Sequence, residues 1–368
     1  MVLGGPSSPI ISYYDSGSRV PCFCLGHGGL GNYWHGVIPL SLRPAYVNGC
    51  EAEFRSLLGH FYPGRALQDE VGRNRLFVPL RPIRPRREWL RLTADRGPLL
   101  DIRFETASRL ELRAGRVLVI TEQARYEARR VWLAAGTFGS AMLLRRSGLI
   151  SDNRRSVSDH AICYLGQVPG SRAVGLGMAG RNRHGYLLDV GDGASGRAVV
   201  SLKPARFDYR ILDRGIQQRA AFGLPIAGAI GKILRASSPG LLSEALFNKF
   251  GLFPRASVYS AYAQVAVPNA LEMGSDGSVE VCRERYVEAC TVARSAIDLP
   301  GITPSRIPEP FIFGIHTHGS LPESAASIAD GMVKVVDSSV LCGVGAEHHS
   351  FYVMSLAHRS VRRGEDIP

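Results

Sequence analysis

The stretch RRVWLAAGTFGSAMLLRRSGL, residues 129–149, decides the fold class. Its first part is a short apolar run, which Gly136 interrupts. From residue 138 to residue 147 the apolar side chains recur with a helical period that ends at Gly148. A buried strand, a glycine turn and a helix make one unit of an α/β layer, in which the glycine lets the backbone approach a ligand closely.

The residues before this unit predict a meander of strands over residues 99–134. LLDIRFETASRLEL and GRVLVITEQ alternate apolar and polar residues, and Ala114-Gly115 supplies the turn between them. Farther upstream we expect a helix over residues 50–61. The basic, proline-rich stretch 81–91 (RPIRPRREWLR) is expected to be a solvated loop, because its prolines stiffen the chain and its charges favour water.

The residues after this unit continue the mixture of strands and helices. Residues 151–210 resemble strands with glycine-rich turns, residues 211–250 have a helical pattern, and residues 257–273 return to strand. Asp276-Gly277 predicts a hairpin turn, after which VEVCRERYVEACTVARSAI passes from strand to helix. VKVVDSSVL is expected to be a buried strand and SFYVMSLAHRSVRR a terminal helix, whose last basic residues suit the helix dipole. The order predicts an α/β (mixed α+β) fold.

Composition narrows the class of protein further. The chain has 368 residues, of which 45% are apolar and 21% charged, so disorder and coiled coil are excluded. The longest apolar candidate, residues 222–234, is shorter than a membrane span and contains Pro225 and Lys232. The first residues lack the pattern of a secretory signal. The 7 cysteines are an odd number without zinc-site spacing, so we expect a reduced, cytoplasmic protein with no membrane span.

The net charge of 44 − 32 = +12 raises the question of nucleic-acid binding. Nearly all of the basic residues are arginines, which is more typical of a GC-rich coding bias than of selection for phosphate contacts. Residues 81–91 form the one marked basic cluster, and no DNA- or RNA-binding motif accompanies it. Nucleic acid is therefore not expected as a partner.

A glycine-rich loop follows the first apolar run, LGHGGLGNYWHG at residues 25–36. Gly26, Gly28 and Gly31 spell a G-x-G-x-x-G, the dinucleotide fingerprint. That fingerprint needs a helix to begin at once, whereas Pro39 and Pro44 forbid a long helix here. We reject the Rossmann interpretation of this loop, although its glycines permit close contact with a flat or anionic ligand.

Histidines gather near the end of the chain, with five of the 10 in the last 53 residues. His316 and His318 precede the predicted strand VKVVDSSVL, and His348 and His349 follow it. Such clusters suit either a metal site or an acid/base pair, because imidazole binds metals and titrates near neutrality. Apart from Glu347 no carboxylate or thiol completes a ligand set, so we expect acid/base chemistry and no metal.

Four ordered blocks resemble the glucose–methanol–choline (GMC) flavin oxidoreductases, and especially their pyranose-oxidase-like bacterial branch. LGHGGLGNYWHG is similar to the family's second flavin motif, and RRVWLAAGTFGSAMLLRRSGL, the most specific block, to its V-V-L-A-A-G-x-x-x-S/T-x-x-L-L-x-x-S-G. VSDHAICYLG is similar to the Asp-His step that follows. IHTHGSLP, VVDSSVL and GAEHHSFYVMSLAHRS resemble the C-terminal segments. The likeness covers about residues 20–40, 100–165 and 255–368.

The resemblance implies non-covalent FAD and oxidation of a CH–OH group in a small-molecule alcohol or sugar, with hydride transfer to flavin N5. It places His316 on the catalytic histidine, which would take the hydroxyl proton, and His348 on the second catalytic position. Gly319 falls on the glycine of H-P-x-G-T, and Tyr33 stands where some relatives attach flavin through histidine, so covalent attachment is not expected. The implied cofactor-binding residues are Gly28, Gly29, Gly31, Asn32, Trp34, Ala135, Gly136, Asp337 and Ser338.

The resemblance also implies a division of the chain. Residues 1–150 would form a partial FAD-binding domain, residues 151–305 an antiparallel-sheet substrate domain, and residues 306–368 a return to the FAD-binding domain. The incomplete Rossmann-like domain lacks the family's N-terminal strand–G-x-G-x-x-G–helix, and the stretch between His316 and Asp337 is short. A partner chain supplying that unit, or a truncated or non-catalytic subunit that binds no FAD, is therefore the alternative; the electron acceptor is unknown.

Overall fold

The computed structural model describes 16 stretches of the chain, and the fold below refers to these alone. They are residues 1–3, 10–15, 20–33, 36–40, 49–65, 76–77, 79, 83–96, 101–151, 155–175, 180–182, 185–190, 198–204, 258–304, 311–341 and 345–363.

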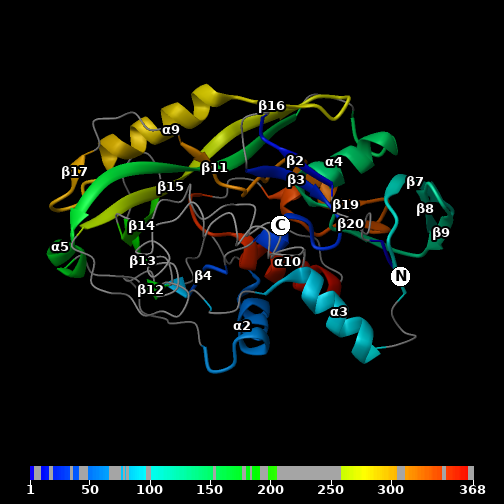
Figure 1. Ribbon diagram of the computed structural model, residues 1–368. Coiled ribbons are helices and arrows are strands. Elements are labelled where there is room, and N and C mark those ends of the chain that lie inside the picture. Colours follow the sequence, from blue (N-terminus) through cyan, green and yellow to red (C-terminus); the bar gives the residue numbers. More distant parts are fainter. Residues whose placement is uncertain are drawn as a thin grey trace, which may run out of the picture.

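An eight-stranded antiparallel sheet is the largest element of the structure (Figure 1). Its main path runs β12-β13-β14-β15-β11-β17, while β16 pairs with β15 and β18 pairs with β11. The bounds are β11 (Arg155–Pro169), β12 (Gly180–Asn182), β13 (Gly185–Val190), β14 (Ala198–Pro204), β15 (Val258–Met273), β16 (Val279–Val281), β17 (Thr303–Pro304) and β18 (Ile312–Phe313). The antiparallel sheet predicted for this half of the chain is confirmed.

One helix lies along the upper side of this sheet in Figure 1, α9 (Arg283–Ala296). It buries Tyr286, Cys290 and Ala293, which lie three or four residues apart and so share one helix face. The short helix α5 (Gly170–Gly175) follows β11 directly. The hairpin at Asp276-Gly277 and the strand-to-helix passage after it agree with the sequence pattern.

The unit predicted at residues 129–149 forms as expected, a strand followed by a helix. Strand β10 (Val131–Leu133) pairs in parallel with β20 (Val333–Val335), and β19 (Ser327–Ile328) pairs antiparallel with β20. Helix α4 (Gly136–Arg146) begins at the glycine turn and buries Phe138, Ala141 and Leu144. The two short 3-10 helices η3 (Glu323–Ala326) and η4 (Ser338–Val340) flank β19 and β20.

Strand β10 is less buried than the sequence predicted. Leu133 is buried, but the Trp132 side chain is 41% exposed and stacks under the Arg130 guanidinium, 5.7 Å from the ring centroid. The reason is that β10 lies at the end of its three-stranded sheet, so its outer edge has no neighbouring strand in the described residues. The expectation of a buried strand is correct for β20 and wrong for β10.

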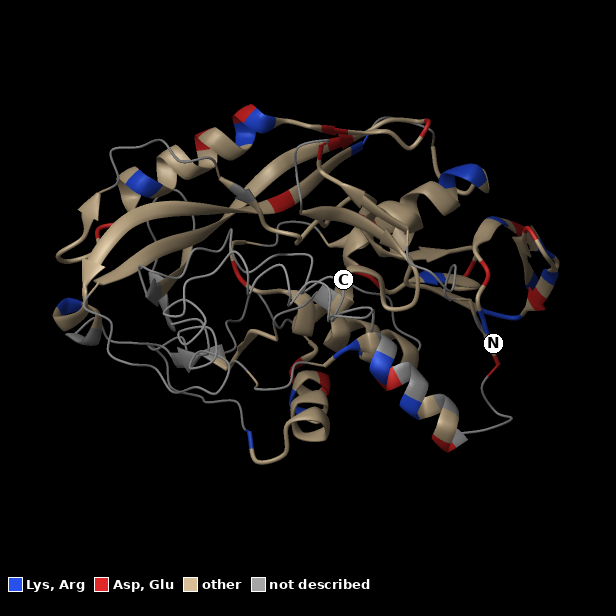
Figure 2. Cartoon of the chain, in the orientation of Figure 1, with Lys and Arg blue, Asp and Glu red and all other residues tan. Residues whose placement is uncertain are grey.

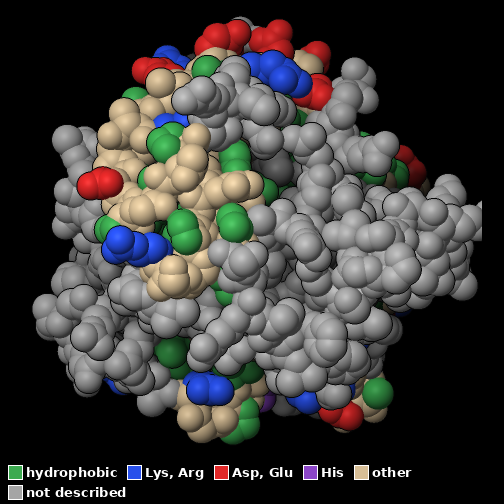
Figure 3. Space-filling view, turned by 60° about the vertical axis from the view of Figure 1, so that its left-hand side comes forward, with side chains coloured by type: hydrophobic (Ala, Val, Ile, Leu, Met, Phe, Trp, Pro, Cys, Tyr) green, Lys and Arg blue, Asp and Glu red, His purple; other side chains and the backbone are tan. Residues whose placement is uncertain are grey.

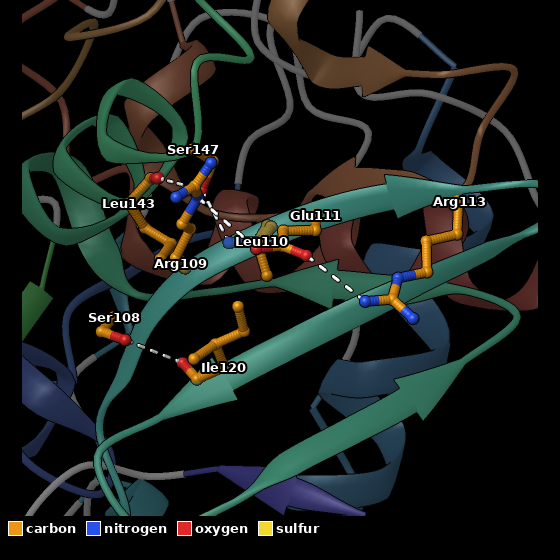
Figure 4. Close-up of polar contacts among 8 residues, drawn as sticks. All are labelled: Ser108, Arg109, Leu110, Glu111, Arg113, Ile120, Leu143 and Ser147. Carbon is orange, nitrogen blue, oxygen red and sulfur yellow. Dashed lines mark hydrogen bonds and ion pairs between the residues drawn. The ribbon is translucent and has the colours of Figure 1, made fainter.

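The predicted meander is present as β7 (Ala107–Arg113), β8 (Arg116–Thr121) and β9 (Arg125–Ala128). Figure 4 shows how it joins α4: the Leu110 N–H donates to Ser147 Oγ (2.8 Å), and Ser147 Oγ donates to the Leu143 carbonyl (2.6 Å). On the other side, Ser108 Oγ donates to the Ile120 carbonyl across the two strands. One serine thus fixes the end of α4 against the meander.

The N-terminal third is built of short strands and two helices. These are β1 (Val2–Leu3), β2 (Ile10–Tyr13), β3 (Pro21–Leu25), η1 (Gly29–Tyr33), β4 (Ile38–Pro39), α2 (Glu51–Phe61), β5 (Leu76–Phe77), α3 (Pro85–Arg96) and β6 (Ile102–Arg103). The terminal helix α10 (Ser350–Arg363) shares a second core with α2, in which Phe54 and Phe351 pack with ring centroids 4.8 Å apart. This contact joins the two ends of the sequence.

The expectation of a solvated loop over residues 81–91 is wrong. Helix α3 begins at Pro85, where proline suits the first helical turn because the missing N–H has no intrahelical partner there. Glu88 and Arg91 then pair at 3.6 Å with the spacing of a helix face. The predicted helical stretch 211–250 lies outside the described residues.

Charged side chains of both signs are mixed on the described surface. Figure 2 shows basic and acidic residues interleaved along α3 and α9, and Figure 3 shows both signs side by side at the top of the molecule. On α9, Arg285 and Glu288 form an exposed pair at 3.7 Å. None of the helices in the described residues has the length and apolar character needed to cross a membrane.

We expect Ser147→Ala to lower the free energy of unfolding by about 1–3 kcal/mol, because it leaves the buried Leu110 N–H without its acceptor. Urea-induced unfolding measures the change. The control is Ser295→Ala on the exposed side of α9, where a surface hydroxyl is expected to contribute less than about 0.5 kcal/mol. Equal losses in the two variants would contradict this role for Ser147.

Candidate active site

The turn between β10 and α4 is held by a buried carboxylate from the end of β20. Asp337 Oδ2 accepts the Gly136 N–H (2.9 Å) and Ser140 Oγ (2.5 Å), while Oδ1 accepts the Ser339 N–H (2.9 Å) and Oγ (2.5 Å). Burial raises the pKa of Asp337, and these donors act against that shift. Asp337 therefore ties the first turn of α4 to η4.

The same turn is tied to the histidine segment that follows β18. Thr137 Oγ1 donates to the Thr317 carbonyl (2.7 Å) and lies 2.9 Å from Ser338 Oγ. In return, Ser320 Oγ donates to the Thr137 carbonyl (2.5 Å). The start of α4 thus fixes residues 317–320, which carry His318 and follow His316 directly.

A bulge places His316 beside β11. The Gly314 N–H donates to the His160 carbonyl (2.8 Å), and two residues earlier on β11 Ser158 exchanges both backbone hydrogen bonds with His318 (3.0 Å each). Three residues of this segment therefore face one residue of β11, so the extra residues bulge out of the ladder. Ile315, in the bulge, has φ +64°, which is strained for a β-branched residue.

Two glycines let the segment approach its neighbours. A Cβ on Gly314 would lie 2.6 Å from the Cβ of His160, so no larger residue fits between the bulge and β11. Gly319 has φ +75°, and a Cβ there would lie 2.9 Å from the Leu341 carbonyl oxygen. Both positions need glycine for steric reasons.

A second buried carboxylate, that of Asp159, binds the backbone of the bulge. Asp159 Oδ1 accepts the His316 N–H (2.9 Å), and Oδ2 accepts the hydroxyls of Tyr14 (2.6 Å) and Tyr286 (3.0 Å). Burial raises the pKa of Asp159 to about 6, although these hydrogen bonds act to lower it. Asp159 and the two tyrosines position the backbone of His316.

Five imidazoles lie together around this bulge. His160 is 0% exposed and His349 3%, whereas His316 and His348 are half-buried. The ring centroid of His316 lies 5.1 Å from that of His160, 5.2 Å from that of His349 and 6.1 Å from that of His348. The His318 ring lies 5.2 Å from the His349 ring. The cluster joins β11, which carries His160, to the bulge and to the residues just before α10.

Backbone carbonyls select the tautomers of two of these rings. His160 Nε2 lies 2.8 Å from the Gly345 carbonyl, and His318 Nδ1 lies 2.9 Å from the His316 carbonyl. A carbonyl accepts only, so each of these nitrogens carries the proton and the other ring nitrogen keeps its lone pair. Burial places the pKa of His160 and His349 well below the usual value and lowers that of His318.

The predicted catalytic pair His316 and His348 is brought together, and the predicted cofactor residues fall into two groups. Ala135, Gly136, Asp337 and Ser338 gather at the start of α4, where Ala135 is exposed and the space in front of a Gly136 Cβ is open. Gly28, Gly29, Gly31 and Asn32 lie in the loop after β3, and Trp34 lies outside the described residues. The buried Asn32 amide donates to the carbonyls of His27 (2.8 Å) and Gly29 (3.4 Å), and so stabilises its own loop.

Sequence analysis gave no role to His160, His318 or His349. His318 and His349 were noted as members of the two C-terminal pairs, but His160 lies more than 150 residues upstream of His316. Its signal was the Asp159-His160 step on a strand. Neighbouring side chains on a strand point to opposite faces, so the carboxylate reaches Tyr286 on α9 while the imidazole reaches the cluster.

Comparison with known proteins adds little to this geometry. No protein-family model matches the chain, and no curated protein matches it. Among solved structures 33 chains match, one of them an FAD-dependent oxidoreductase from Chaetomium thermophilum in complex with a small-molecule fragment. The match has 12% identity and a TM-score of 0.37, and it covers 74% of this chain and 63% of that one. A likeness this loose carries no argument about activity, so the GMC resemblance stays a prediction.

We expect Gly319→Ala to lower the free energy of unfolding by about 1–3 kcal/mol, because it combines a left-handed backbone with a clash against the Leu341 carbonyl. The matched control is Gly59→Ala in the last turn of α2, where a Cβ meets nothing within 4 Å. Alanine there is expected to raise stability by about 0.5–1 kcal/mol. Thermal unfolding followed by circular dichroism compares the two, and opposite signs are expected.

The buried imidazoles predict loss of stability in acid. His160, His318 and His349 stay neutral in the folded protein, whereas in the unfolded chain they bind protons below about pH 6.5. Stability present above pH 6.5 is therefore lost as the pH falls, by up to about 1.4 kcal/mol per histidine at pH 5.5. Asp159 has the opposite effect. Its pKa in the folded protein is raised to about 6, so as the pH falls the folded protein binds a proton that the unfolded chain does not, and this adds about 1 kcal/mol of stability.

The measurement is urea-induced unfolding between pH 7.5 and pH 5.5 in a buffer containing EDTA, with a net loss of about 2–3 kcal/mol expected. In His349→Gln the loss shrinks because one titrating group is removed. The control is His60→Gln, which removes an exposed histidine of α2 outside the cluster. Stability that stays constant or rises on acidification would contradict the neutral cluster.

Proposed function

We propose that this chain provides the catalytic face of a flavin-dependent oxidoreductase acting on a CH–OH group of a small-molecule alcohol or sugar. The observation that carries the proposal is the pairing of His316 and His348, two half-buried imidazoles with ring centroids 6.1 Å apart. They project from the bulge and from the residues just before α10. The GMC resemblance assigns the same two residues to catalysis.

The surroundings of His316 suit a base. Its backbone N–H is fixed by Asp159, so the position of the ring is set by buried groups rather than by a surface loop. The neighbouring His160 and His349 are kept neutral by burial, so they place no positive charge beside it. A neutral imidazole that takes the hydroxyl proton is the chemistry required, and His348 would hold the same oxygen.

The cofactor would supply the acceptor for the hydride that leaves carbon. The described residues fit the two ends of FAD unequally. Near the start of α4, Gly136 leaves open space beside exposed Ala135, which suits a flat ring. For the ADP end, η1 replaces the long helix that a pyrophosphate site needs, and Asn32 and Asp337 already use their polar atoms within the chain.

A partner chain or further segment that completes the FAD site is part of the proposal. Parallel sheets are normally larger and covered on both sides, whereas the parallel pair β10–β20 ends at β10 in the described residues. Trp132 on that edge strand is 41% exposed. An added strand beside β10 would extend the sheet and bring a nucleotide-binding unit next to the start of α4.

The test is alcohol-dependent flavin reduction under anaerobic conditions in protein supplied with FAD. The loss of flavin absorbance measures the rate of reduction. His316→Ala and His348→Ala are each expected to slow reduction by about 10²–10⁴-fold without changing the thermal unfolding temperature. His60→Ala, on the exposed face of α2, is the control and reduces flavin at the wild-type rate. Protein that retains no flavin, even with candidate partner chains, would overturn the proposal.

A further inference from the structure

Three imidazoles of the cluster converge on one point. His160, His316 and His349 each offer one ring nitrogen, and these three nitrogens lie within 4.8 Å of one another. The residues come from β11, from the bulge and from the position before α10. We propose that they bind a borderline divalent cation, Zn²⁺, with water as the fourth ligand.

The distances are close to those of a zinc site. A point equidistant from three atoms 4.8 Å apart lies about 2.8 Å from each, whereas Zn–N bonds are about 2.0–2.1 Å long. Each nitrogen would therefore move inward by at most about 0.7 Å. Rotation of the side chains about their own bonds supplies a movement of that size without any change in the backbone.

Two of the three converging rings each have a buried nitrogen without a hydrogen-bond partner among the described residues. The proton of His160 is on Nε2, where it meets the Gly345 carbonyl, so its Nδ1 presents a lone pair to the protein interior. His349 Nδ1 is likewise buried without a partner. Buried polar atoms in folded proteins are almost always satisfied, and a cation between the rings would satisfy both.

The arrangement around the rings is that of metal-binding histidines. The ring N–H of such a ligand usually donates to a carbonyl or carboxylate, as His160 does to Gly345, which aims the other nitrogen at the metal. His318 packs against the His349 ring, with ring centroids 5.2 Å apart. Three neutral imidazoles favour zinc or its transition-metal neighbours over Mg²⁺ and Ca²⁺, which require oxygen ligands.

The open coordination position would face His348. His160 and His349 close the buried side of the site, whereas His316 is half-buried and its ring lies 6.1 Å from that of His348. Zinc bound here would use the lone pair with which His316 would otherwise act as a base. The proposal goes beyond the proposed oxidation and needs no flavin, so the two can be tested apart.

The experiment is isothermal titration calorimetry, in which ZnCl₂ is added to the full chain after bound metal has been removed with EDTA. One ion per chain is expected, and His316→Ala should weaken binding by at least about 100-fold because it removes a ligand. His316 is half-buried, so the variant is expected to fold, and its unfolding temperature in EDTA checks this. His60→Ala should bind zinc as the wild type does, and MgCl₂ should give no binding.

A second readout guards against misfolding. Zinc should raise the unfolding temperature of the wild-type protein and of His60→Ala, with the logarithm of its concentration once the site is saturated, but not that of His316→Ala. Absence of zinc uptake by the wild type, or equal uptake by wild type and His316→Ala, overturns the proposal. His348→Ala distinguishes the two proposals: in EDTA it should impair alcohol oxidation, whereas with added zinc it should still bind one ion per chain.

Discussion

The mismatch between β11 and the segment beside it is the constraint on which the site depends. Gly314 and His318 pair with His160 and Ser158, so three residues must fit opposite one. The surplus bends outward, and Ile315 adopts a left-handed backbone as a result. Strain of this kind persists only where surrounding contacts overdetermine it. Here the contacts are Asp159 on the His316 N–H and Thr137 on the Thr317 carbonyl.

Those two contacts connect the site to both halves of the fold. Asp159 extends to Tyr286 on α9 and therefore to the covered face of the large sheet. Thr137 belongs to the first turn of α4, whose N-terminal glycine is held by Asp337 at the end of β20. The bulge is thus fixed between two buried carboxylates, one in each sheet system.

The local sequence pattern predicted most of the described helices and strands. It failed for helix α3 and for the exposure of strand β10. The turn at Gly136, the helix before Gly148 and the hairpin at Asp276-Gly277 follow from glycine chemistry and periodicity alone. Helix α3 was missed because its prolines and charges were taken as signs of a stiff, solvated loop, whereas proline suits the first position of a helix. The exposure of Trp132 was missed because no local signal says that a strand lies at a sheet edge.

The site shows the same limit more sharply. His316 and His348 were found through a motif, but a motif assigns one role to each residue and is silent about the residues packed behind them. His160 joins them only because β11 runs past the bulge, and this pairing of distant segments is tertiary information. Without His160 the two C-terminal pairs offered no complete ligand set, which is why sequence analysis favoured a base over a metal.

The two proposals assign different chemistry to His316, and the difference between them is electrostatic. Burial keeps His160 and His349 neutral, and a neutral His316 beside them would hold a lone pair on one ring nitrogen. With a dication between the three rings, the same lone pair is consumed and positive charge replaces it. A base at His316 then gives way to a Lewis acid whose free position faces His348. Which species fills the cluster therefore decides whether a bound hydroxyl meets a proton acceptor or a metal.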